Sequence, residues 1–164
     1  MKVQKQSTIL RLKLLFLSYF GLGYAPKAPG TVGSLFTIPL FFLVNYLSAS
    51  FEFVLIFTII LTVVACYVAD SVQKELDVQD PGWIVMDEVI GMLVTWLFIF
   101  PNVDPPSLIV LFIAFRFFDI VKIQPAKFID TKMKSGAGTI LDDVVSAVYA
   151  GLVVLLYQYA SSQF

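Results

Sequence analysis

The chain has 164 residues, of which 59% are hydrophobic and only 14% are charged. A soluble domain carries about 25% charged residues, so this composition predicts a membrane protein and argues against a soluble one. The formal net charge is −1 and no tract interleaves basic with aromatic residues, so nothing indicates a nucleic-acid partner, and no protein partner is evident. The length predicts a single domain covering residues 1–164.

The N-terminal stretch combines an apolar segment, residues 9–20, with the basic residues Lys2, Lys5, Arg11 and Lys13. It resembles a signal peptide superficially, but two of the basic residues lie inside the apolar run and no convincing small-residue cleavage site follows. The segment is too short to cross a bilayer on its own. It therefore predicts a short helix in the membrane interface.

Five further segments are apolar enough to be candidate membrane spans, at about residues 31–49, 51–69, 84–100, 106–121 and 140–160. The fourth is the weakest candidate, because Arg116 and Asp119 lie near its end. The sequence thus predicts an all-α, multi-pass membrane protein with about four to five apolar helices and an N-terminal interfacial helix.

The basic residues predict how this protein is oriented. All eleven Lys and Arg residues lie before residue 31, between the second and third apolar segments, or between Arg116 and Lys134. Because basic loops favour the cytoplasmic side, we place the N-terminus and residues 70–83 and 122–139 in the cytoplasm.

Five carboxylates form three clusters near the ends of apolar segments: Asp87 with Glu88, Asp119 alone, and Asp142 with Asp143. Acidic groups near membrane depth are costly and usually mark function. The chain has no histidine and one cysteine, so oxygen ligands for a magnesium-type cation are the favoured chemistry. Simpler explanations are helix capping for the paired acids and an ion-pair ladder with Arg116 and Lys122 for Asp119. The predicted topology favours a shared site, because it brings all three clusters to one side of the membrane.

A glycine-rich stretch, residues 21–34, leads into the first apolar segment. Glycine lets backbone amides approach a ligand closely, and a following helix start favours an anion. The candidate phosphate-binding residues of this stretch are Lys27, Gly30, Thr31 and Ser34. The stretch is not a Walker A loop, and a simple capped turn would use the same residue types.

Four motifs occur in order, at residues 25–34, 84–91, 115–122 and 136–143. They read Ala-Pro-Lys-Ala-Pro-Gly-Thr-Val-Gly-Ser, Ile-Val-Met-Asp-Glu-Val-Ile-Gly, Phe-Arg-Phe-Phe-Asp-Ile-Val-Lys and Gly-Ala-Gly-Thr-Ile-Leu-Asp-Asp. Together they strongly resemble the phosphatidylglycerophosphatase A family, over most of the chain. The resemblance implies an all-helical, Mg²⁺-dependent phosphatase of the bacterial cytoplasmic membrane that converts phosphatidylglycerophosphate to phosphatidylglycerol and phosphate.

The resemblance also implies the active-site and metal-binding positions, which are Asp87, Glu88, Asp119, Asp142 and Asp143. Asp130 is a weaker candidate. The chain departs from the family where a Lys-Pro-Trp-Pro run is common, because it reads Lys122-Ile123-Gln124-Pro125. That difference argues against a role for this loop in headgroup recognition and leaves the phosphatase assignment intact.

We expect three of these acids, Asp87, Asp119 and either Asp142 or Asp143, to bind one or two Mg²⁺ ions at the cytoplasmic interface. Glu88 or the remaining aspartate would orient or deprotonate the attacking water, and an aspartyl-phosphate intermediate is the alternative.

Basic residues would then bind the substrate, with Lys27 at the terminal phosphate and Arg116 or Lys122 at the other. Two competing functions are an ion-binding transport protein, which would distribute its acids through the membrane depth, and a lipid-headgroup phosphotransferase with the same metal chemistry.

Overall fold

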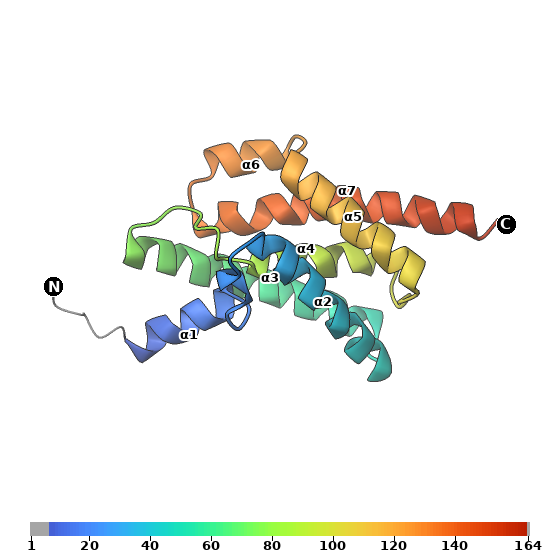
Figure 1. Ribbon diagram of the computed structural model, residues 1–164, viewed down its shortest axis with the longest axis horizontal. Helices are drawn as coiled ribbons and strands as arrows, with labels where there is room; N and C mark the ends of the chain where they lie inside the picture. Colours follow the sequence, from blue (N-terminus) through green and yellow to red (C-terminus); the bar gives the residue numbers. More distant parts are fainter. Residues whose placement is uncertain (1–6, 164) are drawn as a thin grey trace.

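The computed structural model describes residues 7–163, and all regular structure within them is helical. The elements are α1 (Thr8–Leu17), η1 (Leu22–Tyr24), α2 (Pro29–Tyr46), α3 (Phe51–Leu76), α4 (Met86–Leu97), α5 (Pro105–Val121), α6 (Ala126–Lys132) and α7 (Gly136–Ser161). Figure 1 shows α3 and α7 running lengthwise through the molecule, with the shorter helices packed around them. The all-α prediction is confirmed.

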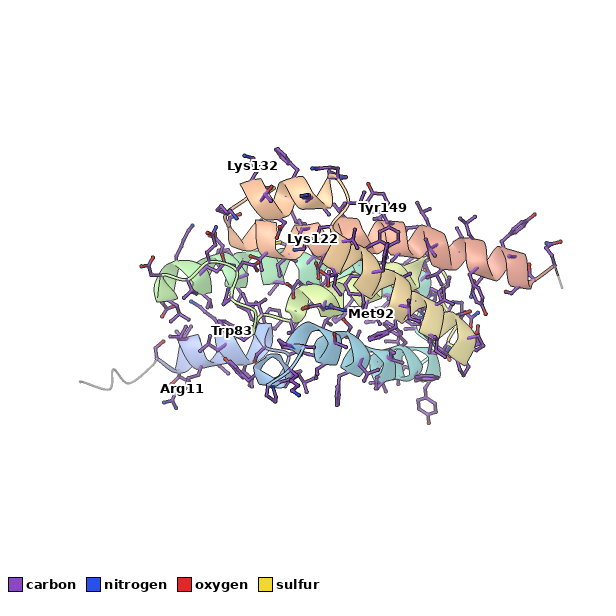
Figure 2. All side chains as sticks on the ribbon, turned by 45° about the horizontal axis from the view of Figure 1, so that its top comes forward. Arg11, Trp83, Met92, Lys122, Lys132 and Tyr149 are labelled. Carbon is purple, nitrogen blue, oxygen red and sulfur yellow. The ribbon has the colours of Figure 1, made fainter. Side chains whose placement is uncertain are left out.

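The two short helices α1 and α6 lie toward the same end of the molecule (Figure 1). Helix α1 buries Leu17, while Lys13 Nζ lies 2.8 Å from Ser71 Oγ and 3.1 Å from Glu75 Oε2 of α3. Arg11, labelled in Figure 2, points away from the body. The placement of α1 in a membrane interface stays a prediction, and Lys2 and Lys5 lie outside the described residues.

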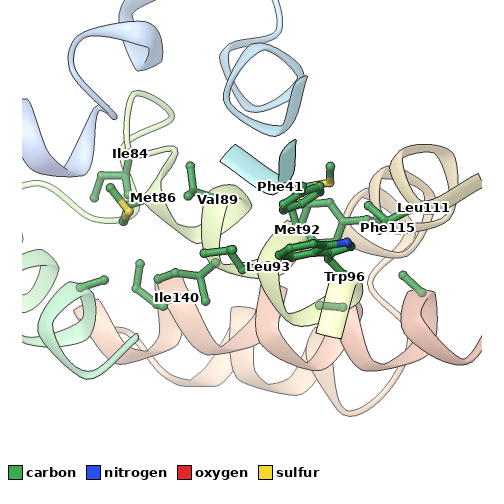
Figure 3. Close-up of a cluster of buried hydrophobic side chains, with 14 of the residues drawn as sticks. Phe41, Ile84, Met86, Val89, Met92, Leu93, Trp96, Leu111, Phe115 and Ile140 are labelled. Carbon is green, nitrogen blue, oxygen red and sulfur yellow. The ribbon is translucent and has the colours of Figure 1, made fainter. Parts of the chain in front are cut away.

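Helix α4 occupies the centre of the bundle, where α7, α3, α2 and α5 all contact it. Its buried Val89, Met92, Leu93 and Trp96 form the middle of the apolar core, and Phe41 of α2 stacks on Trp96 with ring centroids 4.6 Å apart (Figure 3). Large side chains of this kind are the main contributors to burial of apolar surface.

The prediction that residues 84–100 form a membrane span is not met. Helix α4 has 12 residues, and a helix of this length rises about 18 Å, short of the roughly 30 Å hydrocarbon core. The chain turns after Leu97 and reaches Pro101, and a residue that precedes proline disfavours the helical region. Hydropathy identified an apolar helix here, but other helices enclose it.

Three helices are long and apolar enough to cross a membrane, α2, α3 and α7. They correspond to the predicted segments at 31–49, 51–69 and 140–160. Helix α5, expected to be the weakest candidate, has 17 residues and exposes Ile109, Ile113 and Phe117 along one face.

The helix termini determine where the acidic residues meet. Helix α7 begins where Ser135 Oγ accepts the Gly138 amide, and α5 ends at Lys122, whose φ of 46° cannot continue a right-handed helix. Helices α2, α4 and α7 therefore begin, and α5 ends, at the same end of the bundle (Figure 1). All three acidic clusters lie at this end, so the prediction that they meet is confirmed, while the side of the membrane that they face stays a prediction.

Candidate active site

The five predicted acids lie on three helices around one buried region. Asp87 and Glu88 occupy the first turn of α4, Asp119 the last turn of α5, and Asp142 and Asp143 the second turn of α7. Asp142 and Asp143 are only 2% and 3% exposed, and Asp119 is 9% exposed. Burial of this many carboxylates is costly without positive partners, so the partners of each acid indicate its role.

Asp87, Glu88 and Asp143 form the closest group of acids. One carboxylate oxygen from each lies within 4.8 Å of the others. No Lys or Arg forms an ion pair with Asp87 or Asp143 among residues 7–163. Like charges this close repel, so the arrangement needs a cation or protons between the carboxylates.

Two observations fit this group to a magnesium ion. Glu88 Oε2 is buried and has no hydrogen-bond partner, and the donor set consists of carboxylate oxygens, which are the ligands that Mg²⁺ prefers. Burial, together with the neighbouring Glu88 and Asp143 carboxylates, raises the pKa of Asp87 well above its ordinary value. Burial likewise raises the pKa of Glu88. Bound Mg²⁺ would stabilise the ionised forms.

Arg116 connects Glu88 to Asp119. Its Nη1 lies 2.8 Å from Asp119 Oδ2 and 3.6 Å from Glu88 Oε1. The ion pair of Arg116 and Asp119 at i,i+3 is therefore present, as the simpler explanation of Asp119 proposed. However, Asp119 also lies within electrostatic range of Asp143 and Glu88, so it belongs to the same site. The buried Nε and Nη1 of Arg116 have no aligned hydrogen-bond acceptor, which leaves donors for an anion.

Lys122 forms a second polar group with Asp142 and Asp130. Its Nζ contacts Asp142 Oδ2 and lies 2.9 Å from Asp130 Oδ1, at the place where α5, α6 and α7 meet (Figure 2). Burial alone would lower the pKa of Lys122, but the two carboxylates outweigh it and raise the pKa. Lys122 therefore stays charged and compensates Asp142. Asp130, the weaker candidate, contributes by holding Lys122.

Gly30 lies in the first turn of α2, against Glu88. A Cβ atom at this position would come within 1.9 Å of Glu88 Oε1 and 3.1 Å of Arg116 Nη1. The sequence suggested that glycine exposes backbone amides here, and the structure adds a steric reason, which is room for Glu88. The positive end of the α2 dipole consequently lies beside the acidic group and Arg116, where it favours negative charge.

The other candidate phosphate-binding residues of the glycine-rich stretch are Thr31, Ser34 and Lys27. Gly30, Thr31 and Ser34 belong to α2 itself, and Ser34 Oγ donates its proton to the Gly30 carbonyl at 2.9 Å. Its hydroxyl is therefore left only as an acceptor. Lys27 is exposed on the preceding loop and forms no ion pair within the described part of the chain. A contact of Lys27 with phosphate stays a prediction.

Sequence reasoning missed the contacts that fix the start of α7 against α3. Gln73 Nε2 donates a buried hydrogen bond of 2.7 Å to Thr139 Oγ1. A Cβ at Gly136 would lie 1.9 Å from the Asp70 amide nitrogen, so only glycine lets the two helices approach this closely. The available signals were the Gly136–Gly138 pair and a glutamine at the end of an apolar helix.

Comparison with known proteins adds an independent line of evidence. The sequence model of the family described as Phosphatidylglycerophosphatase A matches residues 15–158. A Haemophilus influenzae protein named Phosphatidylglycerophosphatase A is 38% identical over 141 residues, which is 85% of each chain. An Escherichia coli protein of the same name is 34% identical over 139 residues, covering 84% of this chain and 78% of that protein. No solved structure matches the chain significantly.

Proposed function

This chain belongs to the phosphatidylglycerophosphatase A family, and from this premise we propose that it hydrolyses phosphatidylglycerophosphate to phosphatidylglycerol and inorganic phosphate with Mg²⁺ as cofactor. The observation that carries the proposal is the convergence of Asp87, Glu88 and Asp143 oxygens within 4.8 Å, beside the half-buried Arg116. Such a reaction belongs to bacterial phospholipid biosynthesis. It needs a site that holds a metal and a phosphate dianion together.

Asp87, Glu88 and Asp143 are the residues that would hold Mg²⁺. When bound, the ion polarises a phosphoryl oxygen and lowers the pKa of a coordinated water. Because the three acids come from the starts of α4 and α7, the packing of these two helices holds the ligands in place. The residues are thus arranged before substrate arrives, which reduces the cost of reorganisation.

We assign Arg116, in place of the exposed Lys27, to the terminal phosphate of the substrate. The side chain of Arg116 is 16% exposed and already lies between Glu88 and Asp119, while its Nε and Nη1 have no aligned acceptor. A planar guanidinium matches two phosphate oxygens. Lys122, held by Asp130 and Asp142, is placed to contact the inner phosphodiester.

Asp119 is the residue we assign to the proton of the attacking water. The water oxygen bonds to phosphorus, its proton passes to Asp119, and the bond from phosphorus to the glycerol oxygen breaks. The leaving oxygen takes up a proton to give the free hydroxyl of phosphatidylglycerol. Asp119 is suited to this step because it lies beside Glu88 and Asp143 without being in the closest group of acids.

We place the protein in the bacterial cytoplasmic membrane with this site facing the cytoplasm. Three helices are long and apolar enough to span a bilayer. The acidic residues, Arg116 and Lys122 all lie at the end of the bundle that carries the basic connections, and basic loops favour the cytoplasm. This clustering at one end also disfavours a transport protein, which would need acids through the membrane depth.

The test is phosphate release from phosphatidylglycerophosphate in detergent micelles, with and without Mg²⁺, for the wild type and Asp87→Asn. Mg²⁺-dependent release that the substitution abolishes would support both the hydrolase and its metal site. Loss of the terminal phosphate from the lipid only when an alcohol is added, with a phosphorylated alcohol formed in place of free phosphate, would instead identify a phosphotransferase. No release from a folded preparation would contradict the proposal.

A further inference from the structure

Helices α2 and α5 enclose an apolar groove that the chemistry described above does not use. Its volume is about 500 Å³, within the range typical of small-molecule sites, and its surface is entirely apolar. We call it the α2–α5 groove. Six of the residues that line it are Leu35, Ile38 and Phe42 of α2 and Leu108, Phe112 and Ile113 of α5.

One end of the α2–α5 groove lies beside the active site, as the spacing of residues along both helices indicates. On α5, Arg116 follows Phe112 by four residues and Ile113 by three, which places it on the same helical face one turn farther on. On α2, Thr31 precedes Leu35 by four residues, one turn before the groove begins. One end of the groove thus lies about one helical turn, roughly 5 Å, from the proposed phosphate-binding residues.

Helices α2 and α5 run in opposite directions, so the groove between them extends from the active-site end of the bundle toward its far end. Helix α2 begins at the active site and α5 ends there, and at the far end Asn45 Nδ2 donates a hydrogen bond of 2.8 Å to the Pro101 carbonyl, near the start of α5. The lining of the groove from Pro105 to Ile113 covers about 12 Å of helix. Ile109 and Ile113 are each 60% exposed, so the groove is open toward the surrounding apolar phase.

We propose that the α2–α5 groove binds an acyl chain of the lipid substrate. This inference rests on the proposed function. A lipid with its phosphate at Arg116 must direct its tails away from the acids and into the membrane, and this groove is an apolar path that starts on the Arg116 face of α5. Its lack of polar atoms fits a hydrocarbon chain, which needs no hydrogen-bond partner.

A second copy of the protein is the competing occupant. A stable interface buries about 800 Å² on each partner and needs complementary surfaces. The α2–α5 groove is a concave furrow between two helices, which suits a thin chain better than a second helical bundle. Its continuity with the site also has no explanation if its role is only self-association.

The experiment fills the groove with Ile109→Trp or, separately, Ile38→Trp. The matched control is Ile60→Trp on α3, because Ile60 is 57% exposed and does not line the α2–α5 groove. Each protein is assayed for kcat/KM with dipalmitoyl and with dihexanoyl phosphatidylglycerophosphate. Molar mass in detergent is measured by light scattering.

We expect both groove variants to lower the dipalmitoyl-to-dihexanoyl ratio of kcat/KM about tenfold, as loss of apolar contacts in a pocket does. The control should keep the wild-type ratio. An unchanged ratio, whether or not kcat/KM falls equally on both substrates, would overturn the groove assignment while leaving the hydrolase intact. A change in molar mass in the groove variants alone would assign the groove to subunit contact and overturn the proposal. Absence of phosphate release from either substrate by the wild type would overturn the proposed function and this inference together.

Discussion

The substitution Gly30→Ala tests whether the close contact of α2 with Glu88 matters for catalysis. The added Cβ would lie 1.9 Å from Glu88 Oε1 and 2.9 Å from Glu88 Cδ. The carboxylate must therefore move by about 1.5 Å to regain an ordinary contact distance of 3.4 Å. A misplacement of about 1 Å in a site can cost about 100-fold in rate, so we expect kcat/KM to fall by about that factor.

The stability of the same variant should change far less than its activity. The atom that the new methyl group meets is the end of a flexible side chain, which moves at lower cost than backbone. We expect a loss near or below the lower end of the roughly 1–3 kcal/mol seen for overpacked cores. Because Glu88 is a proposed ligand, the concentration of Mg²⁺ for half-maximal activity should rise. The measurements are phosphate release as a function of Mg²⁺ and a thermal melt in detergent.

Gly82→Ala is the matched control, because a Cβ at Gly82 meets nothing within 4 Å. It should keep wild-type activity and stability. Adding Gly30→Ala to Glu88→Asp should lower activity less than Gly30→Ala lowers it in the wild type, since the shortened acid ends near the position of Glu88 Cδ, 2.9 Å from the new Cβ, and clashes with it less. Wild-type kcat/KM and wild-type Mg²⁺ dependence in Gly30→Ala would refute the steric argument. A loss in the free energy of unfolding as large as the rise in activation free energy calculated from kcat/KM would also refute it.

Three further predictions concern single contacts. Asp143→Asn should lower phosphate release at least 100-fold and abolish the rise in Tm that Mg²⁺ gives the wild type, since a ligand that binds only the folded state stabilises it; an equal rise would contradict the metal site. Lys122→Met should destabilise the protein by about 3–5 kcal/mol by leaving buried Asp142 uncompensated, and adding Asp142→Asn should recover most of this in a denaturant titration. Gln73→Leu should cost about 1–3 kcal/mol, because Thr139 loses its buried partner, and unchanged stability would show that the bond contributes little.

The positions of most helices could be predicted from the sequence because their apolar runs and end signals agree. The role of residues 84–100 could not, because hydropathy measures how apolar a segment is and does not say whether lipid or protein surrounds it. Helix α4 is nearly as apolar as a span, yet Met92, Leu93 and Trp96 face other helices. Helix α4 is too short to span a membrane, and its length is limited by the turn that follows Leu97.

The site was predicted as a set of five acids, but its internal division depends on geometry. In the sequence, Asp142 and Asp143 are equivalent neighbours. On α7 they point about 100° apart, so Asp143 faces Asp87 and Glu88 while Asp142 faces Lys122. Whether Asp142 or Asp143 faces the acids of α4 depends on how α4 and α5 pack around α7. These three helices are distant from one another in the sequence.

The same angular step explains why two adjacent pairs of acids serve one site without crowding it. Asp143 contributes to the proposed metal site, and its neighbour Asp142 holds Lys122, which caps the end of α5. On α4, Asp87 turns to the metal group while Glu88 contacts both that group and Arg116. Each pair therefore joins the metal-binding group to a basic residue on α5. Because Arg116 and Lys122 both lie on α5, a displacement of this helix would move both proposed phosphate contacts together while leaving Asp87, Glu88 and Asp143 on α4 and α7. Substrate binding and proton transfer to Asp119 thus depend on α5, and metal binding depends on the packing of α4 against α7.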